Sequence, residues 1–349
     1  MTSDPVAGAV DAAAVAAWMD ETGLGAGPLE DLRPLPGGTQ NVMLRFRRSG
    51  RDYVLRRGPR HLRPRSNQNI LREITVVSAL GTTDIPHARL IAACTDPAVL
   101  GDAVFYLMEP VDGYNAAVEL PPRVAADAAE RHAMGLRAVR ALALLGEVDP
   151  AAAGLDGFGK PDGFLERQVS RWTGELESFS GLDGYTGPDL PGVSRLASWL
   201  EASRPRQGRT GILHGDYHLA NVMFTPGGPE IAAIVDWEMS TLGDPLLDLG
   251  ALLAVWPEAD GVPDLIGTAL SAAGGLPSER EAVAEYARHS GRDLSDLDWY
   301  VVLAAFKLGI VLEGTNARAQ AGMADTATGD RLHAHALALF ERALRRSAV

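Results

Sequence analysis

Two short segments in which apolar runs flank carboxylate and amide side chains constrain the fold of this chain more than any other feature. The first occupies 211–224 with the sequence GILHGDYHLANVMF, and the second occupies 231–238 with the sequence IAAIVDWE. Each segment predicts a short buried strand followed by a loop that carries polar groups. A hard divalent cation prefers oxygen ligands, so Asn221 and Asp236 are candidate magnesium ligands. Asp216 is then a candidate to orient a hydroxyl group and accept its proton during phosphoryl transfer.

An aspartate and an asparagine five residues apart are, taken alone, more often part of a turn than of a site. Here the pattern is longer, because the strand ending at Asp236 is followed by Gly-Asp-Pro at 243–245 and by Asp248. The longer pattern favours a site. Two neighbouring residues stay open: His218 could approach a substrate or lie in solvent, and Glu238 could support a metal ion or be a surface acid.

The order of the predicted elements indicates an α+β chain, with a small antiparallel β-sheet lobe followed by a larger, mainly helical lobe. The early part contains the patterns of a helix, a hairpin, a second helix and two strands, at 10–19, 32–57, 67–80, 88–94 and 103–108. The later part contains helical patterns, at 124–145, 194–202, 265–273, 278–288, 297–312 and 328–345. We therefore expect an N-terminal lobe at 1–109, a C-terminal lobe at 110–349, and a cleft between them.

The two segments resemble the aminoglycoside phosphotransferase and choline kinase superfamily, which has the protein-kinase-like fold. The similarity is strongest to the branch that contains the N-terminal kinase-like domain of certain acyl-CoA dehydrogenases, and it extends from about 32 to beyond 256. It implies that Asp216 is the catalytic base and that Asn221 and Asp236 bind Mg²⁺. It also implies that Asp248 supports the catalytic loop, which His214 is expected to order.

The resemblance further implies an ATP site in the first lobe. The family's nucleotide loop corresponds to a glycine turn that contributes Gly37, Gly38, Thr39 and Asn41, although paired glycines alone are ordinary turn residues. On the following hairpin, Val54 and Arg56 share one face of a strand, so Val54 could line the adenine while Arg56 reaches the phosphates. Protein kinases use lysine at this position, and Arg57 remains an alternative.

Glu73 lies seventeen residues after Arg56, on the apolar side of the predicted helix at 67–80. An acid in that position needs a partner, and Arg56 is the expected one; a solvated pair with Arg72 is the alternative. Between the lobes, the segment that contains Met108 and Glu109 resembles the hinge strand whose main chain reads the adenine edge.

The composition limits the partners. The chain has 32 basic and 45 acidic residues and a formal charge of -13, which disfavours nucleic acid and anionic membranes. No apolar stretch approaches the ~20 residues of a membrane span, and the N-terminus does not have the pattern of a secretory signal. The single cysteine, Cys94, lies in an apolar run and is expected to be a buried structural thiol. We expect a cytoplasmic protein of undetermined oligomeric state.

Two rival functions and two classes of acceptor have to be compared with a small-molecule kinase. A protein kinase is disfavoured, because six residues between Asp236 and Gly243 leave no room for a long activation segment. A non-catalytic scaffold predicts loss of the candidate catalytic residues, which are all present. The acceptor could be a hydroxy acid or its CoA thioester, with the basic run at 56–65 as a candidate surface patch for CoA. It could instead be a cationic aminoglycoside, for which the candidate acids are Glu175, Glu177 and Glu258.

Overall fold

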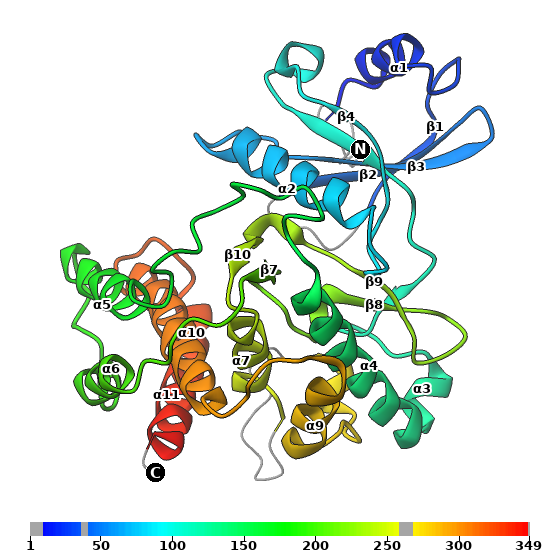
Figure 1. The fold of residues 1–349 in the computed structure, drawn as a ribbon. Helices are drawn as coiled ribbons and strands as arrows, with labels where there is room; N and C mark the ends of the chain where they lie inside the picture. The colour runs from blue at the N-terminus through cyan, green and yellow to red at the C-terminus, as the bar shows by residue number, and fades with distance from the viewer. Residues whose placement is uncertain (1–9, 36–40, 258–267, 348–349) are drawn as a thin grey trace.

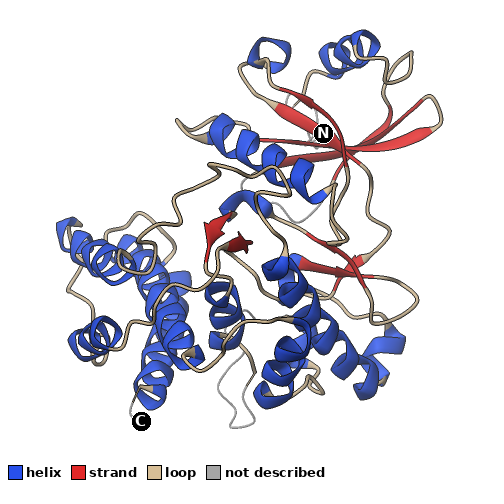
Figure 2. Cartoon of the chain, viewed as in Figure 1, coloured by secondary structure: helices blue, strands red, loops and turns tan. Residues whose placement is uncertain are grey.

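The computed structural model describes residues 10–35, 41–257 and 268–347, and they form a smaller β-rich lobe above a larger helical one (Figure 1). The α+β layout predicted from the sequence is confirmed (Figure 2). No helix in the described ranges is long and apolar enough to cross a membrane. The division into lobes at 109 and 110 stays a prediction.

The smaller lobe is built on a five-stranded antiparallel sheet with the strand order β1-β2-β3-β5-β4. Its elements are α1 Ala12–Glu21, β1 Glu30–Pro34, β2 Val42–Arg48, β3 Arg51–Arg57, α2 Ser66–Leu80, β4 Leu90–Cys94, a 3-10 turn at Pro97–Leu100 and β5 Phe105–Met108. The N-terminal helix, the hairpin, the following helix and both later strands were all predicted. Cys94 is a buried free thiol, as expected.

Strand alternation sends the side chains of β3 to two different helices. Leu55 packs in a cluster with Met19 of α1, whereas Val54 packs with Ile70 of α2 on the opposite face. Arg56, two residues after Val54, therefore projects toward α2 rather than toward α1. Strand alternation thus places the guanidinium group of Arg56 on the side of the lobe where the predicted site lies.

The larger lobe contains the remaining helices, with two small antiparallel sheets at its upper edge (Figure 1). Its helices are α3 Pro122–Ala126, α4 Ala128–Glu147, α5 Gln168–Ser178, α6 Val193–Ala202, α7 Leu246–Ala254, α8 Ala269–Ala272, α9 Glu279–His289, α10 Leu297–Gln320 and α11 Thr326–Arg346. Its strands are β6 Tyr114–Asn115, β7 Gly211–Leu213, β8 Val222–Phe224, β9 Ile231–Ile234 and β10 Thr241–Gly243, with short 3-10 turns at Phe179–Gly181, Leu219–Asn221 and Trp237–Met239.

Two helical predictions for this lobe need correction, and a third is tested only in part. The single helix expected at 124–145 is two helices, because the carboxylate of Asp127 accepts hydrogen bonds from the amides of Ala129 and Glu130 and so starts a new helix. The helix expected at 297–312 continues to Gln320. The helix expected at 265–273 lies partly outside the described residues, and its described part is α8. Helices α5 and α7 were not predicted.

Candidate active site

The loop after β7 is shaped by Gly215, which has a left-handed backbone with a φ of 85°. A side chain at this position would also overlap the carbonyl oxygen of Met239. Only glycine meets both conditions without strain. The loop thus turns sharply directly before Asp216, and this turn explains why the sequence has glycine between His214 and Asp216.

Asp248, at the start of α7, holds this loop from below. Its carboxylate accepts hydrogen bonds from the amides of His214 at 2.6 Å and Gly215 at 3.0 Å. Complete burial raises the pKa of Asp248 to about 6, although the two amides oppose that rise. The supporting position expected for Asp248 is therefore present in the geometry.

The imidazole of His214 ties the same loop to the second motif. It is fully buried, its Nε2 lies 2.9 Å from the carbonyl oxygen of Val235, and its Nδ1 accepts the amide of Asp216 at 3.3 Å. Burial lowers the pKa of His214, so the ring is neutral near pH 7. A neutral ring can donate through Nε2 and accept through Nδ1, which suits an ordering role.

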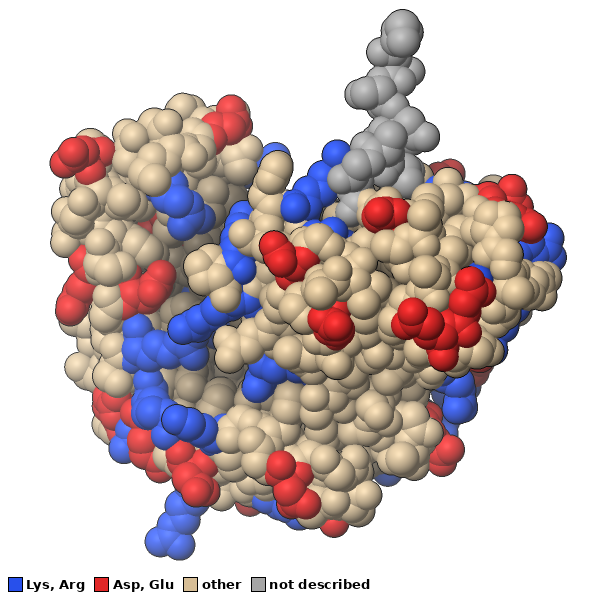
Figure 3. Space-filling view, turned by 90° about the horizontal axis from the view of Figure 1, so that it is seen from above, with Lys and Arg blue, Asp and Glu red and all other residues tan. Residues whose placement is uncertain are grey.

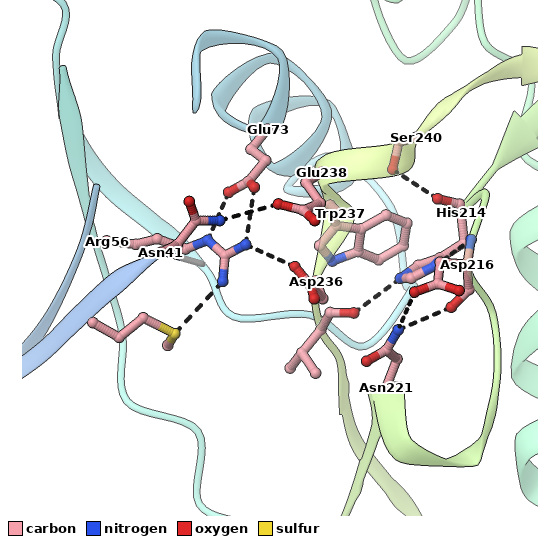
Figure 4. A network of polar contacts seen from close by, with 12 residues as sticks. Asn41, Arg56, Glu73, His214, Asp216, Asn221, Asp236, Trp237, Glu238 and Ser240 are labelled. Atoms are coloured by element: carbon pink, nitrogen blue, oxygen red, sulfur yellow. Dashed lines mark hydrogen bonds and ion pairs between the residues drawn. The ribbon is translucent and has the colours of Figure 1, made fainter. Parts of the chain in front are cut away.

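Asp216 lies beside Asn221 (Figure 4) and close to His218. The side-chain nitrogen Nδ2 of Asn221 donates to the main-chain carbonyl oxygen of Asp216 at 2.9 Å and lies 3.3 Å from its Oδ2. Nε2 of His218 lies 3.5 Å from the same Oδ2. The contact with His218 holds the pKa of Asp216 below its ordinary value, and Lys307 lowers it further. Asp216 is therefore a carboxylate at neutral pH. His218, which the sequence left open, approaches this group.

Asp236 occupies a strained turn after β9 and faces the N-terminal lobe. Its backbone is left-handed, with a φ of 67°, a conformation that aspartate tolerates better than most residues. Its side chain is 40% exposed, and its Oδ1 lies 2.7 Å from Nη2 of Arg56. Strain of this kind at a polar turn is typical of functional sites.

Arg56 is held at the end of this contact by a buried ion pair (Figure 4). Its Nε and Nη2 donate to the two carboxylate oxygens of Glu73 at 2.8 and 2.9 Å, and the hydroxyl of Tyr106 donates to Glu73 at 3.1 Å. Burial alone would lower the pKa of Arg56, but the carboxylate of Glu73 outweighs it and the pKa is raised. The predicted pairing of Arg56 with Glu73 is present.

Arg72, the alternative partner of Glu73, and Arg57, the alternative phosphate-binding cation, both make other contacts. Arg72 stacks on the ring of Phe158 and donates to the carbonyl oxygen of Ser240. Arg57 is buried and donates to the carbonyl oxygens of Gly58 and Pro59. Because Arg56 and Arg57 are buried, they do not contribute to a basic surface patch at 56–65, contrary to one expectation for a CoA acceptor.

Oxygen donors for a metal ion converge at this point. Glu73, Asp236 and Glu238 each offer a carboxylate oxygen within 4.8 Å of the others. Glu238 also accepts a hydrogen bond from Asn41 at 3.1 Å, and burial, followed by the charge of Asp236, raises its pKa. The amide nitrogen of Asn221 faces Asp216, which leaves its oxygen as the group able to bind a cation. These donors fit a hard divalent ion such as Mg²⁺.

The structure describes some, but not all, of the other residues predicted to bind the nucleotide. Val54 and Met108 are buried partners in the β3-β5 pairing. The amide of Glu109 already donates to the carbonyl oxygen of Arg89 at 2.9 Å, so a main-chain contact to adenine from Glu109 would have to use its carbonyl group. Three residues of the predicted nucleotide loop lie outside the described residues: Gly37, Gly38 and Thr39.

Sequence reasoning missed one charged residue beside the catalytic loop. Lys307 lies on α10, and burial lowers its pKa while the nearby carboxylates of Asp248 and Asp216 oppose that change. The available signal was a single cation within an otherwise apolar helical stretch at 299–312. Such a position indicates a charge that is turned toward the protein rather than toward solvent.

The two-lobed fold and this arrangement of loops define a kinase-like protein. The chain belongs to the phosphotransferase enzyme family, whose model matches residues 31–297. This membership supports a kinase that acts on small molecules.

The relatives agree with the family assignment. Acyl-CoA dehydrogenase family member 10 of Mus musculus is 30% identical over 312 residues, which cover 87% of this chain and 28% of that protein. The chain thus spans less than a third of the length of this relative. The crystal structure of a putative aminoglycoside phosphotransferase from Ralstonia eutropha is 32% identical, with a TM-score of 0.80 over 96% of this chain and 99% of that one. The same fold occurs in the aminoglycoside phosphotransferase APH(4)-Ia in complex with ADP and hygromycin B, which is 14% identical, with a TM-score of 0.61 over 95% of this chain and 98% of that one.

Proposed function

We propose that this protein is a Mg²⁺-dependent enzyme that transfers the γ-phosphate of ATP to a hydroxyl group of a small molecule. The observation that carries the proposal is the carboxyl group of Asp216, which contacts Asn221 and His218 in a loop whose amides donate to Asp248. ATP is used inside cells, so the cytoplasmic location expected from the sequence belongs to the same proposal.

The residues of this chain would divide the reaction as follows. Asp216 accepts a hydrogen bond from the acceptor hydroxyl, orients its oxygen toward the γ-phosphorus and takes up its proton. The new bond joins that oxygen to phosphorus, and the bond from phosphorus to the β,γ-bridging oxygen breaks, so that ADP leaves with the electron pair. Arg56, which Glu73 holds in place, binds phosphate oxygens through its guanidinium.

Asn221 and Asp236 would hold the metal ion, and Glu238 lies close enough to support it. When bound, Mg²⁺ neutralises charge on the phosphate oxygens. In the described structure, Arg56 already contacts Asp236, so a cation that approaches this carboxylate meets a guanidinium there. We propose that phosphates draw the guanidinium of Arg56 away from Asp236 when nucleotide binds.

The nucleotide loop would be completed by Gly37, Gly38 and Thr39, with Asn41 at its end. We propose that Val54 lines the adenine, and that Met108 and the carbonyl group of Glu109 contribute main-chain contacts. The acceptor is either a hydroxy acid, free or as its CoA thioester, or an aminoglycoside. A non-catalytic scaffold is the alternative from a different class.

The test is ADP release from Mg²⁺-ATP over a panel of hydroxy acids, hydroxyacyl-CoAs and aminoglycosides. The Asp216→Asn variant is run in parallel, with nucleotide affinity measured as the control for folding. We expect turnover of at least one acceptor class and its loss by a factor of ~10³ or more in the variant, with nucleotide affinity retained. Absence of Mg²⁺-ATP binding would support the scaffold alternative. Equal turnover by Asp216→Asn and the parent would exclude the role given to this carboxylate.

A further inference from the structure

Lys307 forms no ion pair within the described part of the chain, although it lies in the largely buried helix α10. Among the described residues, no carboxylate lies within ion-pair distance of its ammonium group, which instead sits 5.7 Å from the centre of the Trp172 ring. A cation removed from water without a counter-charge is unfavourable. Asp248 and Asp216 attract this charge from beyond ion-pair distance, so the ammonium group itself is left open to an anionic group of a bound molecule.

Arg171 brings a second cation to the same indole ring. Its guanidinium carbon lies 4.9 Å from the centre of the Trp172 ring, and its charge repels that of Lys307. Among the described residues, Arg171 also has no ion pair with a carboxylate. Two like charges gathered on one aromatic ring favour an anion between or beside them.

The outer part of this basic cluster lines a hollow of about 430 Å³ at the start of α5. Lys160, Arg167 and Arg171 lie on its wall, together with Phe164, Gln168 and Ser170. In the described ranges, the hydrogen bonds of Arg167 go to the main-chain oxygens of Asp162 and Lys160, which do not neutralise its charge. Seen from above, Lys and Arg side chains gather around the hollow between the N-terminal lobe and the helices on the side of α5 (Figure 3).

The segment that lines this hollow is connected to the catalytic loop through strand β10. The segment that leads into α5 packs against β10, because Phe164 lies beside Gly243 and Gly159 lies beside Thr241. Strand β10 pairs in turn with β7, the strand that leads into the catalytic loop. Lys307, whose ammonium group lies over the Trp172 ring of α5, also acts electrostatically on Asp216. An acceptor whose hydroxyl reaches Asp216 would therefore extend past Lys307 toward Arg171.

We propose that the acceptor carries an anionic group, bound by Lys307 and Arg171 next to Asp216 and by Lys160 and Arg167 further out. This inference rests on the proposed phosphotransferase function and narrows its substrate class. Both lysines of the chain belong to this basic cluster, Lys160 on the wall of the hollow and Lys307 beside Trp172, in a protein with a net charge of -13. An aminoglycoside would bring its ammonium groups against four cations. The candidate acids for such a substrate do not offset them, because Glu175 and Glu177 are exposed on α5 and Glu258 lies outside the described residues.

Two anions share this chemistry, and they differ in where the charge lies. A free hydroxy acid places its carboxylate a short distance from its hydroxyl, within reach of Lys307. A hydroxyacyl-CoA thioester has no free carboxylate and carries its phosphates far from the hydroxyl, where Lys160 and Arg167 line the hollow. Variants at the inner and outer cations therefore distinguish the two sources.

The test is isothermal titration of the protein saturated with Mg²⁺ and AMP-PNP. The titrants are short- and medium-chain hydroxy acids, their methyl esters, their CoA thioesters, and kanamycin. We expect the acids or the thioesters to bind at least ~10-fold more tightly than the matched esters, because a charge-assisted contact is lost in the ester. Lys307→Gln should weaken the acids by about 10-fold, and Lys160→Gln with Arg167→Gln should weaken the thioesters by a similar factor.

Arg318→Gln is the matched control, because it removes one cation from the exposed face of the same helix, about 16 Å along the axis from Lys307. It should bind every titrant like the parent. The inference is overturned if esters bind as tightly as acids and thioesters, if kanamycin binds most tightly, if no anion binds, or if the inner and outer variants all behave like Arg318→Gln. Nucleotide affinity, measured in the same protein, separates these outcomes from failure of the phosphotransferase proposal.

Discussion

Replacing Glu73 by glutamine tests the ion pair on which the N-terminal half of the site depends. The side chain of Glu73 is 1% exposed and that of its partner Arg56 is 8% exposed. Removing one partner of a buried pair costs about 3–5 kcal/mol, because the remaining charge is left without compensation. Glutamine keeps one oxygen, and Asp236 still contacts Arg56, so we expect a loss near the lower end, about 3 kcal/mol.

This loss is measured as a shift of the urea midpoint. With a slope of ~3 kcal/mol per molar for a chain of this size, a loss of about 3 kcal/mol lowers the midpoint by about 1 M. The KM for ATP should rise by about 10-fold, because Arg56 is no longer oriented toward the phosphates. The nucleotide effect and the stability effect therefore come from one contact.

The chain supplies its own control in the exposed pair of Arg51 and Glu109. Their side chains are 51% and 48% exposed, and their closest atoms lie 3.1 Å apart. Glu109→Gln removes the same charge at the edge of the same lobe, and exposed pairs contribute below about 1 kcal/mol. Equal urea midpoints for Glu73→Gln and Glu109→Gln would refute the reasoning, and so would an unchanged KM for ATP in Glu73→Gln.

The remaining predictions concern the catalytic loop and the metal. The raised pKa of Asp248, about 6, means that the folded protein holds this proton more tightly than the unfolded chain. The contribution of Asp248 to stability is therefore largest below the ordinary aspartate pKa and is lost as the pH rises through about 6. Activity should change in the opposite direction: kcat should fall as the pH drops below about 6, because a protonated Asp248 is a poorer acceptor for the amide of Gly215. A pH-rate profile whose acid limb lies near pH 4 would contradict this prediction. Gly215→Ala should lower stability by more than ~2 kcal/mol and abolish turnover, whereas Gly227→Ala, which has open space and no left-handed backbone, should be neutral in the same melting and turnover assays. Removing Mg²⁺ with EDTA should abolish turnover, and added Mg²⁺ should restore it; activity that persists in EDTA would exclude the assigned metal dependence.

Part of the candidate site could be predicted because the periodicity of strands and helices determines which side chains face each other. The Arg56 and Glu73 pair follows from two periodicities, since strand alternation and helix spacing direct both side chains to the same space between β3 and α2. The position of Asp248 below the loop came instead from the family resemblance. Its geometry agrees, although nothing in the local sequence indicates which amides it contacts.

Other features depend on contacts that a sequence pattern does not encode. The break at Asp127 falls inside an alanine-rich helical pattern, and only the capping bonds of its carboxylate end one helix axis and start the next. Lys307 becomes informative only when Trp172, from a different helix, is found under its ammonium group. Helix α5 carries only three buried apolar residues at helical spacing, Val169, Trp172 and Leu176, and this short signal was missed in the sequence.

Segment 236–240 receives three contacts from the N-terminal lobe. Arg56 reaches Asp236, Asn41 donates to Glu238, and Arg72 donates to the carbonyl oxygen of Ser240. One five-residue stretch thus joins the sheet, the end of the predicted nucleotide loop and α2 to the larger lobe. By thermodynamic linkage, any cation that displaces Arg56 from Asp236 changes the free energy of separating the lobes, and separation changes the affinity for that cation by an equal factor. Opening and closing of the two halves and arrival of the metal are in this way one coupled equilibrium rather than two independent events.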